Sequence, residues 1–285
     1  MNIIRIKNLE DPGLDVFARR SEAQLYHFNE PDPGVFIAES AYVILRALEA
    51  GYKPLSLLVE EERMDAEAEP VLSRIGELYG EAFADEMPVY TAGKEVLAGL
   101  TGYALVRGLW AVLEREEVPG IESFCAGKDR ITVLFDVVNP TNVGAIIRSA
   151  AALGMDGALL THASVDPLTR RSARVSMGTV FQLPWTKLPD EKLCGAGVIR
   201  KLQELGYKTV AMALTDDSVD ACNEEMLSNK RLAVIMGTEG YGLPDEVIEA
   251  CDYRVMIPME HGVDSLNVAA ASAVIFWIIR HYSQK

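Results

Sequence analysis

The sequence predicts an α/β protein: a mainly parallel sheet covered by helices in its second half and a smaller α/β unit in its first half. Three observations support this prediction. Nearly half of the 285 residues are apolar, which is enough for a sizeable core. Apolar runs of strand length alternate with helical segments in the second half. Acidic side chains concentrate in the first half: residues 1–129 carry 12 basic and 24 acidic side chains, and residues 130–285 carry 15 and 18.

The first 117 residues are predicted to form the smaller α/β unit. Residues 35–48 are expected to be helical, and residues 54–59 are expected to form a short apolar strand. The acidic stretch at 60–69 is typical of a solvated loop or helix face. Two further apolar pieces lie at residues 89–90 and 104–113.

A linker is predicted at residues 118–129, because Pro119, Gly120 and Gly127 interrupt the apolar pattern there. Residues 130–285 are predicted to form one domain in which strands alternate with helices, which indicates a mainly parallel, doubly covered sheet. Its expected elements are strands at 131–138, 158–160, 209–214, 232–236 and 254–257, helices at 143–153 and 266–282, and the end of a further helix at 201–205. The last helix is apolar on nearly every face, so we expect it to be buried, with one side in a subunit interface.

Composition narrows the class of protein. Residues 1–10 are charged and lack the apolar core of a secretion signal, and the apolar run 266–279 is too short for a bilayer, which takes roughly 20 residues. We therefore expect a cytoplasmic protein with no membrane association. The cysteines show no paired spacing, which favours reduced thiols and no metal site. They are Cys125, Cys194, Cys222 and Cys251.

The net charge of −15 argues against a generic nucleic-acid binder, because phosphate neutralisation needs Lys and Arg. One basic cluster, Arg170, Arg171 and Arg174, lies in the less acidic second half. These arginines are candidates for phosphate contacts, and a solvated basic loop is the alternative.

Three polar loops follow predicted strands of the second half. They carry Asn142, Glu239 and Ser265, and each also contains glycine, proline or asparagine. Because the carboxyl ends of parallel strands meet at one edge of a sheet, the three loops predict one composite site.

Each loop also has a purely structural interpretation. Asn142 could cap a helix that starts at Val143, and Ser265 alone could cap the terminal helix. Arg148 lies on an otherwise apolar helix and is either a surface residue or a cation directed into a site. The glycine spacing around Glu239 is not a dinucleotide fingerprint. A hydrolase triad of His261 with its close neighbours is disfavoured, because residues this close in one loop rarely reach the required geometry.

Taken together, these segments resemble the SpoU-type (TrmH-like) family of 2′-O-ribose RNA methyltransferases in the knotted SPOUT superfamily. The resemblance covers about residues 130–282. It rests on NPTNVGAIIR at 139–148, MGTEGYGL at 236–243, IPM at 257–259 and SLNVA at 265–269, with RVSMGTVF at 174–181 as a linking segment. The first half is similar, more loosely, to the small substrate-binding domain that many members carry.

The resemblance implies an AdoMet-dependent enzyme that methylates a ribose 2′-hydroxyl of structured RNA, with rRNA favoured over tRNA. It also implies a C-terminal trefoil knot and a homodimer that pairs through the terminal helices. Two other functions remain open: a knotted RNA- or ribosome-binding protein without catalysis, and an AdoMet methyltransferase with a non-RNA substrate.

Site residues follow from the same resemblance. Arg148 would engage the 2′-hydroxyl, and Asn142, Glu239, Ser265 and Asn267 would position Arg148, the ribose and the loops. S-adenosyl-L-methionine (AdoMet), with no metal, would be held mainly by backbone. The residues implied for AdoMet are Met212, Ala213, Gly237, Ile257, Met259 and Leu266.

Overall fold

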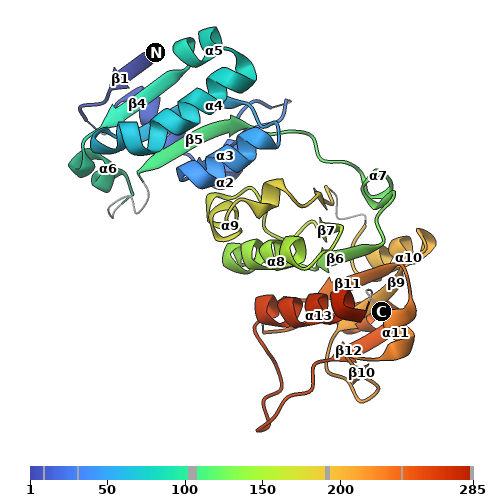
Figure 1. Ribbon diagram of the computed structural model, residues 1–285. Helices are drawn as coiled ribbons and strands as arrows, with labels where there is room; N and C mark the ends of the chain where they lie inside the picture. Colours follow the sequence, from blue (N-terminus) through green and yellow to red (C-terminus); the bar gives the residue numbers. More distant parts are fainter. Residues whose placement is uncertain (9, 31, 102–107, 190–192, 239, 283–285) are drawn as a thin grey trace. The chain divides into compact units, whose positions relative to one another are not determined.

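The computed structural model describes residues 1–8, 10–30, 32–101, 108–189, 193–238 and 240–282 (Figure 1). The chain divides into two compact units. The first comprises Met1–Glu117 and Leu168–Phe181, and the second comprises Val118–Pro167 and Gln182–Lys285. Both units combine helices with one sheet, so the predicted α/β class is confirmed.

The sheet of the first unit has the strand order β1-β4-β3-β5-β2 in the described residues. Strand β5 runs antiparallel to β2 and β3, and the other pairings are parallel. The strands are β1 (Asn2–Arg5), β2 (Val35–Glu39), β3 (Pro54–Glu60), β4 (Pro88–Ala92) and β5 (Leu109–Glu114). The short helices are η1 (Pro12–Leu14), α1 (Asp15–Ala18), α2 (Glu22–Tyr26), α3 (Ala41–Glu49), η2 (Glu61–Arg63), η3 (Met64–Ala68), α4 (Glu69–Tyr79), α5 (Glu81–Glu86), α6 (Lys94–Thr101), α9 (Arg170–Val175) and η4 (Thr179–Phe181).

The helix predicted at 35–48 was wrong over its first five residues. All five residues of β2 are buried, so this apolar run lies inside the sheet, and the helix α3 begins only at Ala41. A short continuous apolar run cannot distinguish a buried strand from a buried helix by periodicity. Ser40, at the junction, has a φ of 83°.

Residues 168–181 lie in the first unit, although the sequence analysis assigns them to a domain spanning 130–285. Arg174 of α9 pairs with the carboxylate of Glu39 at 3.0 Å. The Phe181 ring packs between the rings of Phe36 and Tyr52, at centroid distances of 5.7 and 5.3 Å. These contacts hold the segment against β2, the edge strand of the first sheet.

The second unit has a sheet of entirely parallel strands in the order β10-β12-β9-β11-β6-β7-β8. The strands are β6 (Arg130–Leu134), β7 (Gly157–Leu160), β8 (Trp185–Lys187), β9 (Lys208–Met212), β10 (Val219–Asp220), β11 (Leu232–Met236) and β12 (Tyr253–Met256). The helices are α7 (Ile121–Cys125), α8 (Pro140–Ala152), α10 (Ala196–Glu204), α11 (Glu224–Ser228), α12 (Asp245–Ala250) and α13 (Val268–Tyr282).

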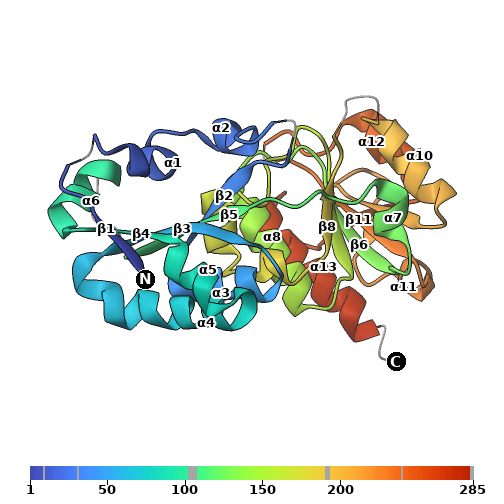
Figure 2. The same ribbon diagram turned by 90° about the horizontal axis from the view of Figure 1, so that it is seen from above.

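Helices cover both faces of this sheet. Figure 2 shows β6, β8 and β11 between α8 and α13 on one side and α7 and α10 on the other. Alternate residues of β6 and β11, such as Ile131, Val133 and Ile235, share one core with side chains of α7, α10 and α12. Helices α8 and α13 pack against each other (Figure 1). The predicted linker at 118–129 contains α7, whose Phe124 is fully buried in this core.

The chain leaves β12 at Met256 and reaches α13 through residues 257–267. This connection would form part of the knot implied by the resemblance. Across the described ranges, every helix is too short or too polar to cross a bilayer.

Candidate functional site

Four neighbouring parallel strands, β12, β9, β11 and β6, end at the same edge of the second sheet. Several of the residues predicted to hold AdoMet lie at this edge. They are Met212 and Ala213 at the end of β9, Gly237 after β11, and Ile257 after β12. The loops are tied together, since Phe135 donates its amide to the carbonyl of Met236 at 2.8 Å and Ala213 donates its amide to Val255 at 3.1 Å. The carboxyl ends of these strands therefore meet at one edge of the sheet, as predicted, and the composite site there stays a prediction.

The first loop, after β6, is held by two hydroxyl groups that the sequence analysis missed. Asp136 has a φ of 53°; its amide donates to Thr161 Oγ1 at 2.8 Å, and the same hydroxyl donates to Asp136 Oδ1 at 2.7 Å. Ser164 Oγ donates to the carbonyl of Leu134 and accepts from the amide of Val137. A polar pair directly after a predicted strand, at 161 and 164, was the available signal.

Helix α8 begins three residues earlier than predicted, and its cap is Asn139. The Asn139 side chain accepts from the amide of Thr141 at 2.9 Å, and Pro140 occupies the first helical position, where no amide donor is needed. The capping interpretation of Asn142 was therefore wrong. Asn142 lies inside the first turn, and only 6 % of it is exposed.

A hydrogen bond between Asn142 and Asn267 joins the motif at 139–148 to the motif at 265–269. Asn267 Nδ2 donates to Asn142 Oδ1 at 3.3 Å. The opposite end of the Asn267 amide is fixed, because its Oδ1 accepts from the amides of Ala269 and Ala270 at the start of α13. Asn142 must then present its oxygen to Asn267, and its buried Nδ2 has no hydrogen-bond partner in the described part of the chain.

Asn267, rather than Ser265, caps the terminal helix. Ser265 is exposed, and its hydroxyl donates to Asp264 Oδ1 at 3.2 Å. The structure therefore brings Asn267 to Asn142 but leaves Ser265 on an exposed loop.

Arg148 is exposed on α8. Six residues separate it from Asn142, a rotation of about 240° at 100° per residue, so the two side chains lie on different faces of the helix. Among the described residues, no hydrogen bond or ion pair engages the Arg148 guanidinium. The arginine is therefore accessible to a ligand, but the chain itself does not direct it toward Asn142.

The glycine-rich loop after β11 folds back on its own base. A Cβ added at Gly237 would lie 2.7–2.9 Å from backbone atoms of Gly242 and Leu243, so only glycine fits. Gly242 also donates its amide to the carbonyl of Thr238 at 3.2 Å. Gly240 and Gly242 have φ values of 92° and 69°. Glu239 lies outside the described residues.

The residues implied for AdoMet binding differ in exposure. Met212, Ala213, Ile257 and Met259 are half-buried, whereas Leu266 is exposed. Met212 is the register partner of Val255 on β12. The half-buried residues could hold an organic ligand against the ends of β9 and β12.

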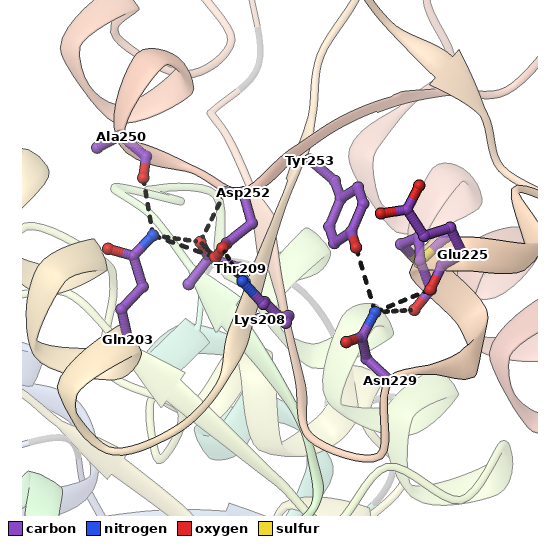
Figure 3. Close-up of polar contacts among 9 residues, drawn as sticks. Gln203, Lys208, Thr209, Glu225, Asn229, Ala250, Asp252 and Tyr253 are labelled. Atoms are coloured by element: carbon purple, nitrogen blue, oxygen red, sulfur yellow. Dashed lines mark hydrogen bonds and ion pairs between the residues drawn. The ribbon is translucent and has the colours of Figure 1, made fainter.

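At its opposite, amino-terminal end, β12 is anchored by Asp252 (Figure 3). Its carboxylate accepts from Lys208 Nζ at 2.6 Å, from the amide and hydroxyl of Thr209 at 3.0 and 2.9 Å, and from Gln203 Nε2 at 3.1 Å. Burial raises the pKa of the Asp252 carboxyl, but these hydrogen bonds outweigh burial and hold its pKa below the ordinary value. The network joins β12 to β9 and α10.

The three arginines predicted to bind RNA lie on α9 in the first unit. Arg170 Nη2 donates to the carbonyl of Phe17 at 3.2 Å, and its guanidinium lies 4.3 Å from the Trp110 ring centroid. Arg174 donates to both oxygens of Glu39, which is 4 % exposed. Arg171 is exposed. Protein groups therefore already engage Arg170 and Arg174.

The cysteines Cys125 and Cys251 are buried, Cys194 and Cys222 are exposed, and all four are free. Burial raises the pKa of the Cys251 thiol to about 12, so this thiol is protonated at neutral pH. Within the described ranges, no group of three or more His, Cys, Asp or Glu side chains could hold a metal ion.

A parallel sheet with polar and glycine-rich loops at its carboxyl edge defines an α/β domain that binds its ligand there. Comparison with known proteins identifies this α/β protein as an RNA methyltransferase. Residues 129–277 match the model of the SpoU rRNA Methylase family. An uncharacterised tRNA/rRNA methyltransferase of Mycobacterium bovis is 32% identical over 272 residues, covering 94% of this chain and 88% of the relative. The chain belongs to the SpoU rRNA methylase family, as its motifs predict.

One further sequence and one solved structure are also similar to this chain. A 23S rRNA (guanosine-2′-O-)-methyltransferase of Bordetella pertussis is 29% identical over 193 residues, which cover 66% of this chain and 76% of that protein. The crystal structure of an AdoMet-bound rRNA methyltransferase from Sinorhizobium meliloti aligns with a TM-score of 0.76 at 24% identity and covers 98% of both chains. The structural likeness supports the fold of both units.

Proposed function

We propose that this chain transfers a methyl group from AdoMet to a ribose 2′-hydroxyl of RNA, with rRNA favoured over tRNA. One observation carries the proposal: the Asn142 amide is fixed by Asn267, and its buried Nδ2 donor at the carboxyl edge of the sheet has no partner among the residues that the structure describes. A buried donor without an acceptor is costly, so a ligand oxygen is its natural partner. Family membership and the printed activity of the Bordetella pertussis relative indicate which ligand.

The residues at this edge fit AdoMet. Gly237 begins the glycine-rich loop that follows β11 at this edge, and Met212 and Ile257 offer half-buried apolar surface. When bound, AdoMet supplies an activated methyl group. The protein's tasks are then to align the ribose hydroxyl and to assist removal of its proton.

Arg148 is the candidate for the second task. A guanidinium stays protonated in proteins, so Arg148 acts as a hydrogen-bond donor rather than a base. Donation to the 2′-hydroxyl lowers the pKa of that hydroxyl and lets its proton pass to a nearby phosphate. Its exposure at the surface of α8 is compatible with this role, because RNA itself would bring the hydroxyl to it.

We propose further that two copies pair through α13. Four exposed residues of α13 follow one another at spacings of four, three and four positions, so they form one stripe along the helix. They are Ala270, Val274, Trp277 and His281. Trp277 is 56% exposed and stacks on His281. A large aromatic in such a stripe is typical of a protein interface.

Sedimentation tests the pairing. Trp277→Glu should shift the mass from dimer to monomer, because a charge is placed in the apolar stripe. Leu78→Glu, at an exposed position of α4, is the control and should not change the mass. A wild-type monomer, or a Trp277→Glu dimer, would overturn the proposed interface.

Methyl transfer tests the function. The protein is incubated with methyl-labelled AdoMet and separately with rRNA, tRNA, total protein and small-molecule extract. Label should enter RNA alone, with rRNA preferred, and nuclease mapping should place it on a ribose 2′-oxygen. Cells with and without the protein should differ at the same nucleotide. Label in protein or small molecules, or AdoMet binding without transfer to any RNA, would refute the proposal.

A further inference from the structure

Exposed apolar side chains lie in the loops that follow four strands of the second sheet. Val138 lies in the loop after β6, Leu214 after β9, Tyr241 after β11, and Val263 and Leu266 after β12. These four strands are neighbours. Apolar groups on one rim of a domain mark a surface that another molecule covers.

Tyr241 is the most exposed of these side chains, at 96%. Tyr241 lies in the connection between β11 and α12. Met236 before the loop and Leu243 after it are both buried, and the bridge between Thr238 and Gly242 closes the base. Tyr241 stands between Gly240 and Gly242, both at positive φ, so the backbone turns sharply on either side and projects the ring from the loop tip.

We propose that the Tyr241 ring stacks on an unpaired base of the RNA substrate beside the methylated ribose. This inference rests on the proposed function and adds to it the substrate class, an RNA loop or bulge with an accessible base. Every base has a π face, and aromatic side chains at exposed positions are the usual platform for unstacked bases. The neighbouring ends of β11 and β6 place the ring at the same edge as Asn142.

The acidic net charge of the protein favours RNA binding through stacking of Tyr241 on a base. At a net charge of −15 the chain can neutralise few phosphates. Arg170 and Arg174 are held by protein groups. Contacts that do not depend on cations would then add to RNA binding, and a tyrosine that is 96% exposed at this edge supplies one.

The test uses RNA hairpins with 2-aminopurine at single unpaired positions, because stacking quenches its fluorescence. Wild-type protein should quench the probe at a base next to the methylated nucleotide. Tyr241→Ala and Tyr241→Leu should weaken RNA binding about 10- to 100-fold and abolish the quench. Tyr241→Phe and Tyr241→Trp should retain both, since they keep an aromatic face. The leucine variant is the matched control for size and apolarity.

Three companion measurements make the test decisive. AdoMet affinity, melting temperature and sedimentation mass should be unchanged in every variant, because the proposal places the ring against an RNA base and gives it no role in cofactor binding or pairing of two copies. The proposal is overturned if Tyr241→Ala binds RNA like wild type, if Tyr241→Leu equals Tyr241→Phe, or if the main loss is in AdoMet affinity or dimer mass. The quench needs no methyl transfer, so a wild-type protein that binds RNA without methylating it would refute only the proposed function.

Discussion

The side chain of Asn267 donates to that of Asn142 across 3.3 Å, and this bond joins the first turn of α8 to the cap of α13. One amide thereby does two things: its oxygen caps α13, and its nitrogen fixes the orientation of the Asn142 amide. Stability and site geometry are separable at this position, because they depend on opposite ends of the same side chain.

Replacing Asn267 with Ala should therefore reduce both stability and methyl transfer. Loss of the cap should lower the free energy of unfolding by about 1 kcal/mol. Methyl transfer should fall further than stability explains, because Asn142 loses the partner that orients it. Chemical denaturation and single-turnover transfer measure the two effects.

The control at this position is Asn267→Asp. Aspartate keeps the capping oxygen but cannot donate to Asn142, so stability should be nearly retained while transfer stays impaired. Full activity of Asn267→Asp would contradict the orienting role of the hydrogen bond.

Arg148→Ala should abolish methyl transfer and leave AdoMet affinity near normal. The side chain is exposed, so the free energy of unfolding should change by no more than about 0.5 kcal/mol. Arg200 is a matched exposed arginine on α10, and Arg200→Ala should retain full activity. Turnover by Arg148→Ala would remove this arginine from the mechanism.

The sequence predicted that the polar loops meet at one edge of the second sheet. The prediction was possible because alternating strands and helices indicate a parallel sheet, in which the carboxyl ends of all strands lie at the same edge. Glycine, proline and asparagine in those loops belong to the motifs from which the family was predicted. The individual caps were harder to predict. Asn139 and Asn142 are both good capping residues three positions apart, and only the Pro140 that follows Asn139 favours the first.

Contacts between distant segments lay beyond local pattern. Nothing near residue 174 signals that its partner is Glu39, 135 residues earlier, so the sequence alone predicts either phosphate contacts or a solvated loop for the basic cluster. The unpartnered Nδ2 of Asn142 was equally invisible, since it depends on burial against a helix that begins 126 residues later. Periodicity describes single elements, whereas partners are determined by their packing.

Arg174→Ala should destabilise the first unit, because it leaves the buried Glu39 carboxylate without its cation. Breaking such a pair costs about 3 kcal/mol at the lower end of the usual range, and the partial exposure of Arg174 favours the lower end. The double variant Arg174→Met with Glu39→Gln should be markedly more stable than Arg174→Ala. If the double variant were no more stable, the ion pair would not be the cause.

Asp252 should make stability depend on pH in the acid range. Its pKa in the folded protein lies below that of an unfolded aspartate, about 3.9. The stabilisation is therefore complete above about pH 4 and is lost as pH falls through the lower, folded-state pKa.

Asp252→Asn should lower the free energy of unfolding by on the order of 2 kcal/mol at pH 7, as expected for hydrogen bonds to a charged group. The difference from wild type should shrink below pH 4. Glu77→Gln, which breaks only an exposed ion pair with Arg74, should change stability little. A wild-type minus Asp252→Asn difference that stays constant to pH 2 would show that the Asp252 carboxylate does not anchor β12 through its charge.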